Sequence, residues 1–231
     1  SRSSAASDVY KRQNLYLLAS SKSSGSKIIF KNKEIEVRNL ENFDFSKADI
    51  TFFSAGGKIS EKYVPKAAKH TVVIDNSSYF RMDPDVPLIV PQVNSKEIKN
   101  MKKNILANPN CSTAQLVIVL KNLNDKVKIK RLVISTYQST SGAGKKPMDE
   151  LLDQTKKALE SKEIKSENFT KQIAFNAIPH IDKFSTDGYT KEEIKMIQES
   201  NKILGSNIDI TATCVRIPVL ISHAESVNIE F

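Results

Sequence analysis

Residues 49–75, DITFFSAGGKISEKYVPKAAKHTVVID, contain the pattern that decides the fold. A short apolar run lies at each end, and between them stand a Gly-Gly turn and a helical stretch at 60–69. A strand, a glycine turn, a helix and a second strand form the βαβ unit of a parallel sheet. We therefore predict an α/β layer fold for the first part of the chain, with further short strands at 88–90 and 104–107.

The part of the sequence after Cys111 mixes long helices with strands, which is typical of an α+β domain. Helical patterns cover 112–122, 146–160 and 190–204, and alternating patterns typical of strands cover 127–138, 208–218 and 222–231. Ser112 and Gln115 have the three-residue spacing of a capping box, as do Thr190 and Glu193. In the last helix we expect the buried face to be formed by Ile194, Ile197 and Leu204.

Composition excludes several classes of protein. The 231 residues are 39% hydrophobic and 26% charged, a balance that supports a packed core. The longest aliphatic run, 116–120, is far shorter than the ~20 residues of a membrane-spanning helix. The net charge is +9, but lysines stand among acids, as at 191–193, which is typical of a solvated surface. Two cysteines are too few for a disulfide scaffold and no signal peptide is visible. We expect a cytoplasmic protein without nucleic-acid partner, membrane partner or metal.

Both ends of the sequence are unusual. Residues 1–13 are serine-rich and carry no apolar period, so we expect a non-native or disordered tail. Residues 222–231 alternate like a half-buried strand up to the last residue, Phe231. We therefore expect the chain to be a fragment that by itself is inactive or only poorly active.

Cys111 is the candidate nucleophile, because it follows the tight turn Asn108-Pro109-Asn110 at the expected start of a helix. Free amides and the dipole at a helix N-terminus stabilise a thiolate and lower its pKa. The same amides can bind an oxyanion. A buried structural cysteine is an equally open alternative, and for Cys214, inside an apolar strand, the structural interpretation is favoured.

A nucleophilic cysteine needs an acid–base partner, and His223 with Arg216 is the candidate pair. Their separation of seven residues would place them on opposite faces of one straight strand. Pro218 argues for a bend that lets them converge on one site. The alternatives are a surface ion pair for Arg216 and a capped turn histidine for His223.

Other charged candidates have ordinary alternatives. Arg81 follows the second strand of the βαβ unit, at the sheet edge where ligands of open α/β sheets bind. Glu192 and Lys195 share a helix face, for which a surface salt bridge is the simpler explanation. The loop 139–145 contains glycines but does not match a phosphate-binding Walker motif.

In combination, these stretches resemble the aspartate-semialdehyde dehydrogenases. The resemblance covers about 15–231 and rests on eight segments in the expected order: LLAS at 17–20, FSAGG at 53–57, VIDNSS at 73–78 with FRMDPDVP at 80–87, NPNCST at 108–113, STYQ at 135–138 with SGAG at 141–144, AFN at 174–176, ATCVRIPV at 212–219, and His223 with ESV at 225–227.

The resemblance implies a Rossmann-type NADP-binding domain joined to an α+β catalytic domain of the glyceraldehyde-3-phosphate dehydrogenase-like type, here truncated at both ends. The tail would be 1–13, the partial NADP-binding domain 14–110, and the partial catalytic and dimerisation domain 111–231. The family's Gly-rich first loop and its C-terminal part have no counterpart in this sequence. Homodimerisation is the implied assembly.

The implied reaction is NADPH-dependent reduction of L-4-aspartyl phosphate to L-aspartate 4-semialdehyde, with release of phosphate. The resemblance makes Cys111 the nucleophile that forms a thioester, His223 the general acid/base and Gln138 the group that orients the carbonyl. The implied substrate ligands are Arg216 for the α-carboxylate, Glu192 for the ammonium, and Arg81 and Lys195 for the phosphate. Asn110 is a further implied substrate ligand. The implied NADP(H) ligands are Ser20, Lys22 and Ser23 at the 2′-phosphate, then Ser54, Gly56, Gly57, Ser141 and Gly142.

Three alternatives remain open. A related acyl-phosphate reductase, such as N-acetyl-γ-glutamyl-phosphate reductase, or a malonyl-CoA reductase would use the same scaffold. A non-catalytic paralogue would serve as a binding module but should lack the thiol or the base. A basic nucleic-acid binder would show steeply salt-dependent retention on DNA.

Overall fold

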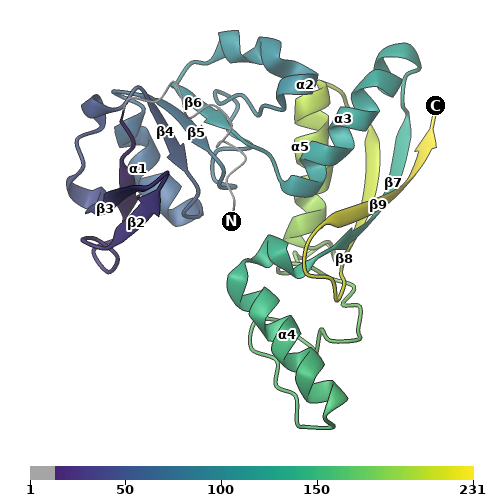
Figure 1. Cartoon of the computed structure of the whole chain (residues 1–231). Helices are drawn as coiled ribbons and strands as arrows, with labels where there is room; N and C mark the ends of the chain where they lie inside the picture. Colours follow the sequence, from purple (N-terminus) through teal and green to yellow (C-terminus); the bar gives the residue numbers. More distant parts are fainter. Residues whose placement is uncertain (1–13) are drawn as a thin grey trace. The chain divides into compact units, whose positions relative to one another are not determined.

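The computed structural model of the chain describes residues 14–231, so the predicted tail at 1–13 lies outside the described residues. The chain divides into two compact units, one reaching to Asp49 and the other running from Ile50 to Phe231. Figure 1 shows the order of the elements along the chain. The predicted boundary at 110/111 stays a prediction; it falls inside the second unit.

The first unit is a small three-stranded sheet of order β1-β3-β2. Its elements are β1 (Leu17–Ala19), β2 (Lys27–Phe30), β3 (Lys33–Asn39) and the 3₁₀ turns η2 (Leu40–Asn42) and η3 (Phe45–Lys47). β1 runs parallel to β3, whereas β2 and β3 form an antiparallel hairpin. Lys31 and Asn32 join the hairpin with positive φ angles of 48° and 61°, the conformation of a type I′ turn.

The second unit begins with the predicted βαβ arrangement. β4 (Ile50–Phe53), α1 (Gly57–Ala67), β5 (Val72–Asp75) and β6 (Ile105–Ala107) build a parallel sheet of order β4-β5-β6. The expected βαβ unit is therefore confirmed.

The connection between β5 and β6 differs from the prediction. It contains the short helix α2 (Pro91–Asn94) and the 3₁₀ segment η4 (Ser95–Asn100). The strand predicted at 88–90 is wrong, because this segment makes a single bridge, between Leu88 and Ala107. Prolines at 87 and 91 bound it, and a proline has no amide hydrogen to extend a ladder.

The rest of the second unit packs helices against one face of a second sheet, of order β8-β7-β9 (Figure 1). Its elements are α3 (Cys111–Lys126), β7 (Arg131–Gln138), η5 (Thr140–Ala143), α4 (Lys145–Leu159), α5 (Lys191–Leu204), β8 (Asp209–Arg216) and β9 (His223–Glu230). β7 pairs in parallel with β8 and antiparallel with β9. Alternate residues of β7 and β8 are buried, and α3 and α5 cover that face. The core between them includes Leu116, Leu120, Leu132, Ile134 and Met196.

Two local predictions need correction. The N-cap of α3 is Asn110, not Ser112, because the Asn110 side chain accepts from the backbone amides of residues 112 and 113. Along α5 the predicted capping box of Thr190 and Glu193 is confirmed. The most buried face of that helix is not the predicted one, however. It contains Glu192, Met196, Glu199 and Ile203, whereas Ile197 and Leu204 pack only partly buried at its border.

Candidate active site

Three of the predicted site residues form one row across the second sheet. The register pairs Gln138 at the end of β7 with Arg216 on β8 and with His223 on β9. Cross-strand partners point their side chains to the same face of a sheet, and this is the face that α3 and α5 cover. Gln138 and Arg216 are buried, and His223 is half-buried. The predicted convergence of Arg216 and His223 is confirmed, since both lie beside Gly142: a Cβ atom on that glycine would stand 3.4 Å from Arg216 Nη1 and 3.1 Å from His223 Nε2.

Cys111 is the first residue of α3, directly after the buried N-cap Asn110. Two glutamates of α5 hold Asn110. Its side-chain Nδ2 donates to Glu192 Oε1 over 2.8 Å, and its backbone amide donates to Glu199 Oε2 over 2.7 Å. The start of the cysteine helix is thereby fixed by α5.

Glu192 connects the cysteine helix to the row on the sheet. Besides Asn110, its carboxylate accepts from Gln138 Nε2 over 3.3 Å and from Lys195 Nζ over 3.2 Å. Its negative charge raises the pKa of Cys111. Burial lowers the pKa of Arg216, and the charge of Glu192 acts in the opposite direction and raises it. Glu192 is buried, so these interactions act at reduced dielectric.

The expectation of a lowered thiol pKa at the helix start is not met. Desolvation raises the pKa of Cys111, and the charge of Glu192 raises it further, against hydrogen bonds from the backbone that lower it. The residue is nevertheless exposed at the surface and free. Cys214 is buried, and burial raises its pKa to about 12, which agrees with a structural role.

His223 is held at its Nδ1 atom by residue Ser139. The backbone amide of Ser139 donates to Nδ1 over 3.0 Å, and the Ser139 hydroxyl lies 3.2 Å from the same atom. Burial lowers the pKa of His223, and the positive charge of Arg216 lowers it further. Arg216 in turn donates from Nη1 to the carbonyl oxygen of Ser139.

The two predicted phosphate cations are both paired. Arg81 is buried; its Nη1 donates to Glu199 Oε1 over 3.0 Å and its Nη2 to the Asn76 carbonyl over 3.1 Å. Arg81 Nε is buried without a hydrogen-bond partner among the described residues. Lys195 donates to Glu192 and to Asp182. Burial lowers the pKa of Lys195, but these two carboxylates outweigh it, so the pKa is raised.

The residues predicted at the cofactor fall in both units. In the first, Ser20, Lys22 and Ser23 are exposed in the turn that follows β1. In the second, Gly56 is the N-cap of α1 with a positive φ of 92°, and no described side chain caps this helix start. Backbone amides and a lysine are suitable donors for phosphate oxygens. Within each unit, these groups are chemically suited to phosphate oxygens.

The remaining predicted cofactor residues lie on the second unit. Ser54 follows β4 and accepts a hydrogen bond from Asn76 Nδ2. Gly57 begins α1, and Ser141 and Gly142 lie in η5 beside His223.

Three polar residues of this network were not predicted: Ser139, Asp182 and Glu199. Glu199 stands seven residues after Glu192, two helical turns along the same face, and this spacing is the signal that was available. Ser139 acts through its backbone amide, and Asp182 lies in a loop, so neither produces a sequence pattern.

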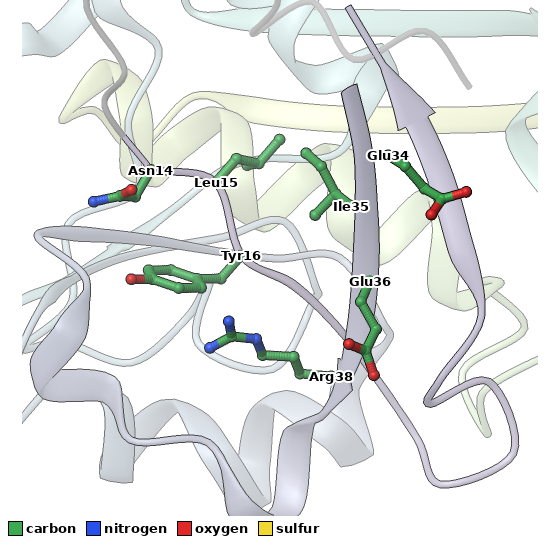
Figure 2. Close-up of a pocket in the computed structure, with 7 residues that line it drawn as sticks. All are labelled: Asn14, Leu15, Tyr16, Glu34, Ile35, Glu36 and Arg38. Atoms are coloured by element: carbon green, nitrogen blue, oxygen red, sulfur yellow. The ribbon is translucent and has the colours of Figure 1, made fainter. Parts of the chain in front are cut away.

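A separate hollow of about 360 Å³ lies in the first unit (Figure 2). It is lined by Asn14, Leu15, Tyr16, Glu34, Ile35, Glu36 and Arg38. It contains none of the predicted site residues. Within residues 14–231, no group of three or more His, Cys, Asp or Glu side chains is arranged to hold a metal ion. No helix in that same range is both long and apolar enough to span a membrane.

Comparison with known proteins gives matches over both parts of the chain. Residues 9–101 match the family model described as semialdehyde dehydrogenase, NAD binding domain, and residues 120–231 match semialdehyde dehydrogenase, dimerisation domain. The aspartate-semialdehyde dehydrogenase of Aquifex aeolicus is 55% identical over 222 residues, which cover 94% of this chain and 65% of that protein. The enzyme of that name from Vibrio mimicus is 48% identical over 219 residues, covering 94% of this chain and 69% of that protein.

A solved structure agrees with these matches. The crystal structure of aspartate semialdehyde dehydrogenase II from Vibrio cholerae complexed with ASA has a TM-score of 0.90 at 49% identity, over 93% of this chain and 65% of that one. The chain thus spans 65% of the length of its Aquifex relative. The predicted fold class, a Rossmann-type domain with a glyceraldehyde-3-phosphate dehydrogenase-like catalytic domain, is confirmed. By sequence and by structure, the chain belongs to the aspartate-semialdehyde dehydrogenase family.

Proposed function

We propose that the whole protein reduces L-4-aspartyl phosphate to L-aspartate 4-semialdehyde with NADPH and releases phosphate, a step of lysine, diaminopimelate, threonine and methionine biosynthesis. The observation that carries the proposal is the connection of Cys111 to the Arg216–Gln138–His223 row through Glu192. The hydrogen bonds run from Asn110, the neighbour of Cys111, through Glu192 to Gln138, and they support a site that combines a thiol, a carboxylate, a guanidinium, an amide and an imidazole. The names of the relatives support the same substrate.

Cys111 acts as the nucleophile. His223 takes the proton of the Cys111 thiol, and the resulting thiolate attacks the acyl carbon of aspartyl phosphate. A carbon–sulfur bond forms and the carbon–oxygen bond to phosphate breaks, leaving a thioester. A bound nicotinamide cofactor would supply the hydride that reduces the thioester carbon. When the carbon–sulfur bond then breaks, the electron pair returns to Cys111 and the aldehyde leaves. Gln138 orients the carbonyl, and His223 is the acid–base group at the reacting oxygen.

Charged groups around Cys111 bind the ends of the substrate. Arg216 forms a bidentate pair with the α-carboxylate, and Glu192 accepts from the ammonium group. Arg81 and Lys195 bind the phosphate, and Asn110 is a further substrate ligand. Arg81 Nε–H has no hydrogen-bond partner within residues 14–231, which supports this role, because a buried donor without a partner is costly unless a ligand supplies the acceptor.

NADP(H) is the proposed cofactor. Lys22 with the hydroxyls of Ser20 and Ser23 suits a 2′-phosphate, whereas an NAD-type ribose ligand would be Asp or Glu. The backbone at Ser54, Gly56 and Gly57 would hold the dinucleotide. Ser141 and Gly142 would lie on its nicotinamide side.

The protein is proposed to work as a homodimer in the cytoplasm. The match to a family dimerisation domain supports the dimer. A free thiol nucleophile needs a reducing compartment, which supports the location.

Formation of the thioester tests the function without requiring the cofactor. The whole protein is mixed with aspartyl phosphate. The amount of phosphate released is measured, and mass spectrometry is used to find a hydroxylamine-labile adduct on the Cys111 peptide. We expect one adduct per chain, lost in Cys111→Ser and kept in Cys214→Ala. An adduct on neither cysteine would contradict the proposal.

The rival substrate, N-acetyl-γ-glutamyl phosphate, carries no ammonium group. Glu192→Gln should therefore weaken adduct formation with aspartyl phosphate and spare it with the acetylated substrate if that one reacts at all. A preference of the unmodified chain for the acetylated substrate would favour the related reductase instead.

A further inference from the structure

Lys202, on α5, donates hydrogen bonds to three backbone carbonyl oxygens of a single turn. Its Nζ atom lies 2.7 Å from the carbonyl oxygen of Arg81, 2.8 Å from that of Asp83 and 2.9 Å from that of Val86. An ammonium group has three N–H bonds and no acceptor, so the three carbonyls use its whole hydrogen-bonding capacity. Lys202 therefore fixes the backbone of residues 81–86 at three points.

The three carbonyl oxygens favour the charged form of Lys202. A neutral amine has only two N–H bonds and would leave one carbonyl without a donor. The side chain is half-buried, and burial lowers its pKa; the carboxylates of Asp83 and Glu199 act in the opposite direction without outweighing burial. Backbone carbonyl oxygens that converge on one point stabilise a cation, as they do in potassium channels. The turn is thus a site for a cation, and Lys202 supplies that cation.

The same helix also holds the side chain of Arg81. Glu199 stands three residues before Lys202, about one helical turn along α5, and accepts from Arg81 Nη1 over 3.0 Å. Glu199 accepts from the backbone amide of Asn110 as well, over 2.7 Å. α5 therefore binds Arg81 at its carbonyl oxygen and at its guanidinium, and it binds the residue that precedes Cys111.

The backbone position of Arg81 determines where its free donor points. Arginine binds phosphate through N–H bonds that have fixed directions. In Arg81, Nη1 donates to Glu199 and Nη2 to the carbonyl oxygen of Asn76. The buried Nε–H has no partner within residues 14–231. The hydrogen bond from Lys202 fixes the carbonyl of Arg81, so a shift of the turn would turn the Nε–H away from its ligand.

We infer that Lys202 is a positioning residue for the phosphate end of the site: its ammonium group holds the turn 81–86 and thereby orients Arg81. The inference rests on the proposed function for the role of Arg81. Lys202 acts through Arg81 and does not itself bind the substrate. A residue without donors at position 202 should release the turn, and a small ammonium ion bound in the vacated space should hold it again.

Chemical labelling of arginines in the whole protein tests the positioning without substrate. Phenylglyoxal modifies guanidinium groups, and peptide mass spectrometry gives the rate at each arginine. Arg81 and Arg216 are 8% and 7% exposed, so both should react slowly in the unmodified protein. Lys202→Met removes the donors and keeps most of the side-chain length. It should raise the rate at Arg81 about tenfold, because hydrogen bonds from a charged group no longer restrain the turn.

Arg216 is the internal reference in this experiment, and its rate should not change in Lys202→Met. An unchanged rate at Arg81 would overturn the inference. An equal increase at Arg81 and Arg216 would indicate a general loss of structure in place of a local effect, and it would overturn the inference too.

Lys202→Ala distinguishes the ammonium group from the carbon chain that carries it. Propylammonium has the three carbons and the nitrogen that this variant lacks. Propylammonium chloride should therefore restore slow labelling of Arg81 in Lys202→Ala, but not in Lys202→Met, whose side chain fills the space. Tetramethylammonium chloride at the same concentration is the control, because it has the charge but no N–H donor. Rescue by both salts, or by neither, would contradict the role assigned to Lys202.

Steady-state kinetics of the reverse reaction connect the turn to the phosphate site. With L-aspartate 4-semialdehyde, NADP⁺ and inorganic phosphate as substrates, Lys202→Met should raise KM for phosphate about tenfold, as expected when one charge-assisted hydrogen bond is lost. KM for the semialdehyde should stay unchanged, because Arg216 and Glu192 are its proposed ligands. Lys157→Met is the matched control; it removes a lysine whose side chain is 39% exposed and should change neither KM. An equal rise in both KM values would count against the inference.

The inference and the proposed function fail in different ways. If Lys202→Met speeds the labelling of Arg81 but phosphate does not protect Arg81 in the unmodified protein, the proposed phosphate role of Arg81 is wrong, whereas its positioning by Lys202 is supported. If phosphate protects Arg81 and Lys202→Met changes neither labelling nor KM for phosphate, the proposed function stands and the inference is wrong.

Discussion

The buried pair of Arg81 and Glu199 makes a quantitative prediction about stability. Their side chains are only 10% and 2% exposed, and the Nη1 to Oε1 distance is 3.0 Å. Glu199→Ala leaves the guanidinium buried without a counter-charge, which typically costs about 3–5 kcal/mol. It also leaves the Asn110 amide without its acceptor, a loss of about 1–3 kcal/mol that overlaps with the first. We expect a total decrease of about 4 kcal/mol in the free energy of unfolding.

Urea denaturation followed by circular dichroism measures this change. With a slope of about 2 kcal/mol per M, the unfolding midpoint should fall by about 2 M. Glu230→Ala is the matched control, because it removes another arginine–glutamate pair, Arg131–Glu230, whose side chains are 46% and 53% exposed. The control should cost no more than about 1 kcal/mol. A Glu199→Ala chain as stable as the control would refute the reasoning.

A double variant distinguishes a buried unpaired charge from lost packing. Burial raises the pKa of Glu199 although Arg81 lowers it, so desolvation outweighs the attraction between the two groups. Replacing both partners by apolar residues, Arg81→Met with Glu199→Leu, should therefore destabilise less than Glu199→Ala alone. A double variant that is less stable than the single one would show that packing dominates.

Three further predictions concern pH, reactivity and capping. Burial raises the pKa of Glu225 to about 7, so the folded state favours the protonated carboxyl. The free energy of unfolding should therefore fall as the pH rises from about 4.5 to 7. Urea titrations at several pH values measure this fall, and Glu225→Gln should abolish it. Glu192→Gln removes a charge that raises the pKa of Cys111, so iodoacetamide should alkylate Cys111 faster at neutral pH while buried Cys214 stays unreactive. Asn110→Ala removes the cap of α3 and should cost about 0.5–2 kcal/mol in thermal unfolding, with Asn110→Ser restoring most of it.

The elements of the βαβ unit were predictable because their signals are local. An apolar run, a glycine turn and a helix follow one another between Ile50 and Asp75, and the structure has them in that order. The cap of α3 was not predictable, because Asn110 and Ser112 are both good N-caps two residues apart. The choice depends on Glu192 and Glu199, which arrive from a helix some 80 residues later and bind Asn110.

The buried face of α5 was misjudged for a related reason. Glu192, Met196, Glu199 and Ile203 recur at intervals of four, three and four residues, which is the spacing of one helix face. A search for apolar periodicity discards this face because two of its four members are charged. Burial of these two carboxylates is possible because each accepts hydrogen bonds from residues on other elements. The sequence of the helix alone does not indicate those residues.

Arg216 and His223 lie on the same face of the sheet although an odd number of residues separates them. An odd or even separation predicts a shared face only for two residues on one straight strand. Seven residues separate them, so on one straight strand they would face opposite sides. They lie instead on two strands, and the register of each strand is set by its own pairing with β7, not by their separation. Both pair with Gln138, so both reach the same face whatever the length of the connection. An insertion at 217–222 that preserves the two registers should therefore leave the row intact, whereas a one-residue slip of β9 against β7 would turn His223 to the other face of the sheet.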